Sequence, residues 1–129
     1  MHYTVILLKK QVVGLIEPVK VIGKNVVESK AKFDTGAARS CIDEKLAEKV
    51  KLGPIIKFVR VKSATLGKIN YVRRPVYKAK IEIAGKRIPV ELSIANRKNL
   101  KYDVLIGRDI IKSNFIIDVE HKNKTVKKV

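Results

Sequence analysis

The chain has 129 residues, of which 46% are apolar, so it is long enough to bury one hydrophobic core and too apolar to be a disordered protein. Its 29 lysine and arginine residues against 12 acidic residues give a formal net charge of +17, which favours nucleic acid, anionic surfaces or acidic peptides as partners. No apolar run approaches the roughly 20 residues that a membrane-spanning helix needs.

These features predict a single domain over residues 1–129 and no membrane association. The segment Tyr3 to Leu8 is too short for the apolar part of a signal peptide and lacks a small-residue cleavage site, so we interpret it as a strand. The one cysteine, Cys41, permits no internal disulfide and agrees with a reducing compartment. We therefore expect a cytoplasmic protein.

The first third of the chain is predicted to be β-structure that leads into a tight turn. An apolar run at Gln11 to Ile16 is followed by Pro18 and Gly23, which interrupt the chain before a strand at Val26 to Phe33. Residues 33–37 read Phe-Asp-Thr-Gly-Ala. The Asp34 carboxylate is therefore expected on a turn that a strand enters, where the backbone does not block access to it.

A short helix and a candidate flap are predicted next. Residues 43–50 contain helix formers with acidic residues at their start, and Gly53 and Pro54 end the helix. A strand is predicted at Ile55 to Lys62. The polar segment Ser63 to Arg74 is the candidate for a flap, a mobile hairpin that closes over a bound peptide.

The clearest strand pattern begins at Val76, where apolar and polar side chains alternate on both sides of a turn at residues 84–86. This pattern predicts a hairpin with one buried face. The side chains of that face are Tyr77, Ala79, Ile81, Ile83, Ile88, Val90, Leu92 and Ile94.

Residues 103–109 read Asp-Val-Leu-Ile-Gly-Arg-Asp and begin the C-terminal part. Val104 to Ile106 is predicted as a buried strand, with Gly107 allowing another segment to approach closely. Asp109 is expected to N-cap the helical turn that follows. Phe115 to Val119 and Thr125 to Val129 flank a turn and predict a terminal hairpin. The expected architecture is a closed, barrel-like β domain with two short helices.

The Asp34 turn has the chemistry of half an active site. Two carboxylates that share one proton can hydrolyse an amide, because like charges about 3 Å apart do not both ionise. One carboxylate takes a proton from the attacking water while its protonated partner hydrogen-bonds the carbonyl oxygen. The chain has one Asp-Thr-Gly sequence, so a second copy would come from another chain across a two-fold axis.

Residues 31–37 and 104–111, taken in this order, resemble the retropepsins, half-size aspartic proteases that work as homodimers. The resemblance implies a closed retropepsin-like (acid protease) β-barrel and a peptide or protein substrate. It implies that the Thr35 side chain hydrogen-bonds across the two-fold axis and locks the paired turns. It assigns catalytic roles to Asp34, Thr35 and Gly36 and supporting roles to Ala37, Gly107 and Arg108.

Three further stretches, residues 20–23, 71–76 and 88–97, resemble the retropepsin-like proteins associated with RimK-type ATP-grasp glutamate ligases, a group often labelled "ATP-dependent zinc protease". The resemblance extends from about Gly14 to Asp118. It implies a peptide-bond hydrolase that trims or counteracts glutamate tails, with a functional link to a RimK-type ligase.

The chain departs from both groups beside the Asp34 turn. The ligase-associated proteins usually have arginine directly after Asp-Thr-Gly-Ala, whereas here Ala38 intervenes and Arg39 follows. Viral retropepsins place an aspartate there that pairs with the arginine of the later motif. Arg108 is expected to brace the turn or the dimer through a carboxylate, and the sequence leaves that partner open.

No cofactor and no metal are predicted. His2, Cys41 and His121 have no recognisable zinc-ligand spacing, and no glycine-rich phosphate loop is present. Two rival functions remain open: a non-catalytic retropepsin-like module that partners a glutamate ligase, and a basic nucleic-acid-binding β domain. Nucleic acid is the less favoured partner because the basic residues are dispersed and few aromatic residues are available for stacking. The charge is also typical of a solvated, heat-adapted surface.

Overall fold

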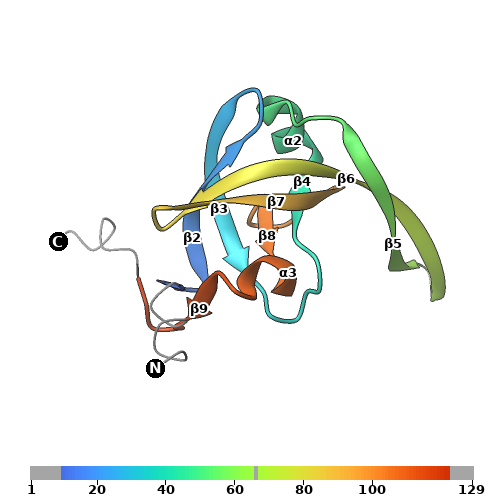
Figure 1. The fold of residues 1–129 in the computed structure, drawn as a ribbon. Coiled ribbons are helices and arrows are strands. Elements are labelled where there is room, and N and C mark those ends of the chain that lie inside the picture. The colour runs from blue at the N-terminus through green and yellow to red at the C-terminus, as the bar shows by residue number, and fades with distance from the viewer. Residues whose placement is uncertain (1–9, 66, 123–129) are drawn as a thin grey trace.

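The computed structural model describes residues 10–65 and 67–122, and it is mainly β, as predicted (Figure 1). The strands are β1 (Gln11–Val13), β2 (Ile16–Ile22), β3 (Val26–Phe33), β4 (Cys41–Asp43), β5 (Ile55–Thr65), β6 (Lys68–Ile83), β7 (Lys86–Ala95), β8 (Val104–Ile106) and β9 (Phe115–Ile117), and the helices are α2 (Glu44–Val50) and α3 (Arg108–Ile111). The predicted strands at Tyr3 to Leu8 and Thr125 to Val129 lie outside the described residues. Within these two ranges, no helix is long and apolar enough to cross a membrane.

The main sheet closes on itself. Its strand order within the described residues is β2-β3-β8-β4-β7-β6-β5, and β2 also pairs with β6. The second pairing joins the strands from β2 to β6 into a ring and leaves β5 outside it, attached only to β6. The pairs β3–β8 and β4–β7 are parallel, so they bring the ends of strands that are distant in sequence to one edge of the ring.

The predicted central hairpin is confirmed as β6 and β7. Ala84 and Gly85 have φ angles of 52° and 76°, the left-handed conformation that tight hairpin turns require. The register pairs Ile81 with Ile88 and Ala79 with Val90, so the apolar faces of both strands coincide. This face packs into the core, as the alternation predicted.

The core fills the ring. Phe33 at the end of β3 meets Phe115 of β9 edge to face, with ring centroids 5.3 Å apart. Burying each large aliphatic side chain contributes about 1.5–3 kcal/mol relative to leaving it exposed. The fully or almost fully buried aliphatic residues include Val13, Val19, Val21, Ile42, Val50, Val76, Ile81, Ile83, Leu92, Val104 and Ile106.

Helix α2 begins and ends as the sequence predicts. The Asp43 carboxylate accepts a hydrogen bond of 3.1 Å from the Lys45 backbone N–H, which caps the first turn. Lys51 takes a left-handed conformation with φ of 56° and ends the helix before Gly53. The helix packs Leu46 and Val50 into the core.

Strands β5 and β6 form a long two-stranded arm that curves away from the rest of the sheet (Figure 1). The strand predicted at Ile55 to Lys62 extends to Thr65, which pairs with Lys68 at the tip. The candidate flap, Ser63 to Arg74, is therefore the outer part of this hairpin. On one face of the arm, Arg60 stacks over the Tyr71 ring and Arg73 over the Phe58 ring, each with 4.4 Å between guanidinium carbon and ring centroid.

Two strand predictions near the termini are wrong. Pro18 does not interrupt the chain but lies inside β2, where β2 pairs with β3 alone; β6 joins only from Lys20 onward. Proline is tolerated there because no second neighbour needs its missing N–H. Strand β9 begins at Phe115 as predicted, but it ends at Ile117. It pairs in parallel with β1, and no local sequence pattern predicts a pairing between such distant segments.

Candidate active site

The Asp34 turn lies where β3 ends beside β8. Phe33 is in register with Ile106, and the Asp34 backbone N–H donates to the Ile106 carbonyl oxygen at 2.8 Å. One carboxylate oxygen of Asp34, Oδ1, accepts a 2.8 Å hydrogen bond from the Gly36 N–H. The side chain is half-buried, so the turn holds the carboxylate while leaving it accessible.

Arg108 braces this turn from α3. Its Nη1 donates to the Thr35 carbonyl oxygen at 2.7 Å, and its backbone N–H donates to the Ala37 carbonyl oxygen at 2.8 Å. Within residues 10–65 and 67–122, no acidic side chain makes an ion pair with Arg108, so these residues do not supply the expected carboxylate partner, and a carboxylate from across a dimer stays a prediction. Within the chain, a backbone carbonyl is the partner. Thr35 itself is exposed.

Gly107 is in close contact with the segment that follows the turn, as predicted. A Cβ atom at this position would lie 2.8 Å from the Ala37 carbonyl oxygen and 2.9 Å from the carbonyl carbon and oxygen of Arg39. Such distances are too short for ordinary non-bonded contact. The φ angle of Gly107 is −98°, a backbone conformation that other residues also adopt. Glycine is therefore needed here because any side chain would overlap the neighbouring backbone.

Ser40 and Asp109 tie the two motifs together, and the sequence analysis missed this contact. The Ser40 hydroxyl donates to Asp109 Oδ1 at 2.7 Å and accepts from the Gly107 N–H at 2.8 Å, while the Ser40 N–H donates to Asp109 Oδ2 at 3.1 Å. The predicted N-cap role of Asp109 is therefore wrong: Gly107 is the N-cap residue, and the Asp109 carboxylate binds Ser40 instead. Ser40 is only 1% exposed.

We expect Ser40→Ala to destabilise the protein by about 1–3 kcal/mol, because it leaves the Gly107 N–H and one Asp109 oxygen without their hydroxyl partner. Equilibrium unfolding in urea measures the change. Ser29→Ala is the matched control, since Ser29 is half-exposed on β3 and its hydroxyl has no hydrogen bond within the described part of the chain. Equal midpoints for the two variants would contradict this role of Ser40.

A basic pocket of about 480 Å³ lies between the Ala37–Arg39 segment, the end of β7 and the β5–β6 arm. Among the residues that the structure describes, no acidic side chain lines it. Its charged lining residues are Arg39, Arg60, Lys62, Arg74 and Arg97.

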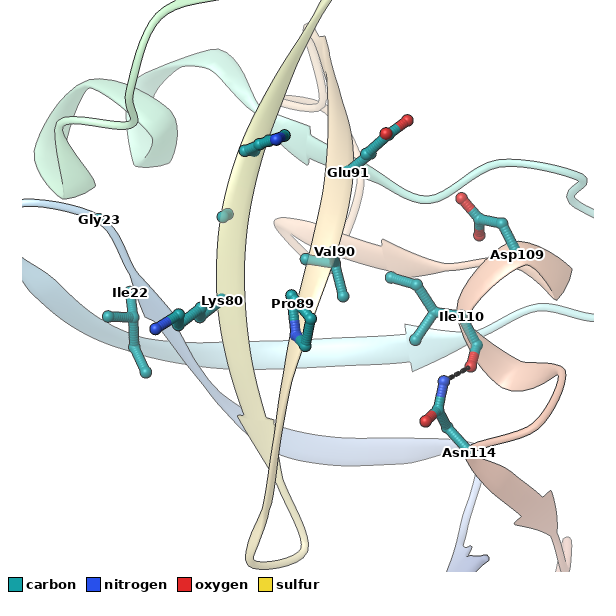
Figure 2. A pocket seen from close by; sticks show the side chains of 11 residues that line it. Ile22, Gly23, Lys80, Pro89, Val90, Glu91, Asp109, Ile110 and Asn114 are labelled. Atoms are coloured by element: carbon teal, nitrogen blue, oxygen red, sulfur yellow. Dashed lines mark hydrogen bonds between the residues drawn. The ribbon is translucent and has the colours of Figure 1, made fainter. Parts of the chain in front are cut away.

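A larger cavity of about 710 Å³, whose described lining does not include Asp34, lies between β2, the β6–β7 hairpin and the α3 region (Figure 2). In the view of Figure 2, the labelled side chains of Glu91 and Asp109 lie to the right of Val90 and that of Lys80 lies to the left. The Asn114 side-chain amide donates to the Ile110 carbonyl oxygen at 2.8 Å and closes the turn after α3. The charges around this cavity are mixed, in contrast to the basic pocket.

An ion pair joins β5 to β7 at the base of the arm. Lys57 Nζ lies 2.9 Å from Glu91 Oε1, and both side chains are 45% exposed. The hydrogen bond from Lys57 holds the pKa of Glu91 below its ordinary value. The pair therefore stabilises the fold above the unfolded-state pKa, and this contribution is lost as the pH falls through the lowered folded-state pKa. Solvent exposure keeps the contribution small.

The possible metal ligands do not converge. In the part of the chain that the structure describes, no group of three histidine, cysteine or acidic side chains is placed to hold a metal ion. His121 Nε2 lies 3.9 Å from the buried Glu17 carboxylate, and Cys41 is buried next to Arg97. His2 is outside the described residues.

A protein-family comparison matches residues 42–128 to the RimB-like family, described as "Retropepsin-like aspartic endopeptidase RimB". The match includes Gly107, Arg108 and the β5–β6 arm, and it begins after the Asp34 turn. A comparison with curated proteins found no match.

Solved structures share the fold. Lpg0085, a protein of unknown function from Legionella pneumophila, has 23% identity and a TM-score of 0.62, with 89% of this chain and 98% of that chain covered. A foamy viral protease-reverse transcriptase has 24% identity and a TM-score of 0.54, with 75% of this chain and 11% of that chain covered. The simian foamy virus protease has 20% identity and a TM-score of 0.50, with 74% of this chain and 91% of that chain covered. The retropepsin-like fold is thereby established.

Proposed function

Because the chain belongs to the RimB-like family of retropepsin-like aspartic endopeptidases, we propose that it is an aspartic peptidase in which two chains each contribute one Asp34. The observation that carries the proposal is the Asp34 turn itself. Its carboxylate is anchored through the Gly36 N–H and remains half-exposed, and the adjoining segment is fixed to the Gly107 region by backbone hydrogen bonds. Only one such turn is present in the sequence.

In the proposed reaction, the two Asp34 carboxyl groups share one proton. The ionised Asp34 takes a proton from a water molecule, whose oxygen forms a bond to the amide carbon of the peptide. The protonated Asp34 donates a hydrogen bond to the carbonyl oxygen and then gives up its proton as the carbon–nitrogen bond breaks. The amine leaves with one proton more, and the new carboxylic acid carries the water oxygen.

The supporting residues act through the turn. Arg108 holds the Thr35 carbonyl, and Gly107 lets the Ala37–Arg39 segment lie against α3. The Thr35 hydroxyl is proposed to reach the partner chain across the two-fold axis, which its exposed position permits. The β5–β6 arm is proposed to act as the flap, which closes over the peptide and binds its backbone through strand hydrogen bonds.

An acidic peptide is the substrate class that we propose, with a glutamate tail added by a RimK-type ligase as the leading example. The net charge of +17 would attract such a substrate over a distance of about one Debye length, ~8 Å at physiological salt. The basic pocket between the segment after the Asp34 turn and the arm supports this proposal, because a peptide held under the arm would meet its positive charges.

Sedimentation velocity across a concentration series tests the shared site. We expect a species with the mass of two 14.5 kDa chains, and a specific activity toward a glutamate-tailed peptide that falls on dilution together with the dimer. Dilution separates chains without altering the fold of each, so the two curves should coincide. A monomer at every concentration, with substrate present, would contradict the proposal.

The second candidate is a non-catalytic module that partners a glutamate ligase. The observation that favours it is the extent of the family match, which leaves the Asp34 turn outside. A module of this kind would bind the acidic tail or the ligase without hydrolysing any peptide. It would therefore bind the same peptides equally well before and after replacement of Asp34.

A further inference from the structure

Arg97 is a buried arginine without a carboxylate partner among residues 10–65 and 67–122. Its side chain is 9% exposed, and its guanidinium donates to the Tyr102 carbonyl oxygen at 2.9 Å and to the Cys41 sulfur at 3.7 Å. No acidic group lies within ion-pair distance of it in the described ranges. The nearby Asp43 carboxylate is already bound to the Arg97 backbone N–H at 2.7 Å. A buried positive charge is costly unless a negative charge compensates it.

Arg97 is one of the residues that line the basic pocket. Arg39 and Arg74 line the same pocket from the segment after the Asp34 turn and from the arm, and they add two further positive charges. Arg74 is half-buried, whereas its neighbour Arg73 stacks on Phe58 on the opposite face of the arm. With Arg60 and Lys62 of β5, the pocket therefore combines five cations from three separate parts of the chain, and no acidic residue of the described ranges lines it. Its charge is unbalanced until an anion enters.

We propose that this pocket is a substrate subsite that binds the carboxylate of a glutamate or aspartate side chain, and that Arg97 is its specificity-determining residue. The proposal rests on the proposed peptidase function, because it places an extended peptide between the arm and the Asp34 turn. Arginine suits this task because its planar guanidinium binds a carboxylate through two parallel hydrogen bonds. Arg39 and Arg74 close the subsite around the same carboxylate.

Peptide binding tests the subsite without requiring hydrolysis. The probes are fluorescent hexaglutamate and hexaglutamine, measured by anisotropy at physiological salt with the full chain carrying Asp34→Asn. We expect Arg74→Gln to weaken hexaglutamate binding about tenfold or more and to leave hexaglutamine binding unchanged, since a charge-assisted hydrogen bond is lost. Arg87→Gln is the matched control: Arg87 is an exposed residue at the start of β7 that pairs with Glu82 and belongs neither to the pocket lining nor to the arm, so removing the same charge there should change binding less than about twofold.

Arg97→Lys and Arg97→Gln test the proposed specificity residue itself. Both should reduce hexaglutamate binding by a larger factor than Arg74→Gln, with the lysine variant retaining more affinity because it keeps the charge. Arg97 also contacts backbone, so a thermal unfolding curve accompanies each variant. If Arg97→Gln does not fold, the comparison of Arg74→Gln with Arg87→Gln decides.

The outcomes separate the subsite from the peptidase. Equal affinity for the two peptides before any pocket substitution, or equal losses in Arg87→Gln and Arg74→Gln, overturns the subsite even where hydrolysis is observed. Selective loss in Arg74→Gln, with no hydrolysis of any peptide by the unsubstituted protein, supports the subsite and contradicts the proposed reaction. Where hydrolysis is observed, Arg74→Gln should raise KM for the glutamate peptide more than it lowers kcat.

Discussion

Asp34→Asn should lower the rate of peptide hydrolysis by a factor on the order of 10³ or more while leaving the fold unchanged. The expected loss is large because general acid–base catalysis alone supplies roughly 10²–10⁴-fold, and in a dimer the substitution removes both the acid and the base. The asparagine side-chain oxygen can still accept the Gly36 N–H, which bonds Asp34 Oδ1 at 2.8 Å. Hydrolysis of a glutamate-tailed peptide, followed by mass spectrometry, measures the effect.

Asp103→Asn is the matched control for that experiment. Asp103 is exposed, and its carboxylate makes no hydrogen bond or ion pair in the described part of the chain, so the same chemical change should leave the rate within about twofold. Circular dichroism and the sedimentation profile should be the same for both variants. An unchanged rate in Asp34→Asn would exclude the shared-carboxylate reaction, whereas the absence of hydrolysis by the unsubstituted protein would favour the binding module.

Features set by local patterns could be predicted from the sequence. The β6–β7 hairpin follows from strict alternation around a left-handed turn, and α2 follows from an acidic cap and helix formers. The Asp34 turn and the close approach of Gly107 follow from short motifs whose chemistry requires glycine or an accessible carboxylate. Each of these depends on residues that are near one another in the chain.

Features that depend on distant residues could not be predicted. Ser40 and Asp109 are 69 positions apart, and either residue alone is consistent with an ordinary turn or cap. Arg108 binds a backbone carbonyl oxygen, and because every residue has one, the sequence does not indicate which carbonyl is the partner. In the sequence, Arg97 is notable only as the last residue of a stretch that resembles the ligase-associated proteins. Its burial depends on how β7 and the segment before β8 pack, which the sequence does not reveal.

Gly107→Ala should be the most damaging single-methyl substitution near the site. Its Cβ would lie 2.8–2.9 Å from carbonyl atoms of Ala37 and Arg39, and backbone cannot withdraw as a flexible side chain can. We expect a loss of about 1–3 kcal/mol in the free energy of unfolding, the usual cost of overpacking. The same displacement would move the segment that Arg108 and Ser40 hold, so peptide hydrolysis should fall more than the unfolded fraction explains.

Gly53→Ala separates this steric effect from the general effect of replacing a glycine. A Cβ at Gly53 would have no atom within 4 Å beyond those of its two chain neighbours. The free energy of unfolding of Gly53→Ala should therefore differ from that of the unsubstituted protein by no more than about 0.5 kcal/mol. Urea unfolding of the two variants gives the comparison directly. If both glycines tolerate alanine equally, the Ala37–Arg39 segment adapts freely to its neighbour, and the close packing at Gly107 does not position Asp34. If only Gly107→Ala is destabilised and also loses activity in its folded fraction, the position of the turn depends on that contact.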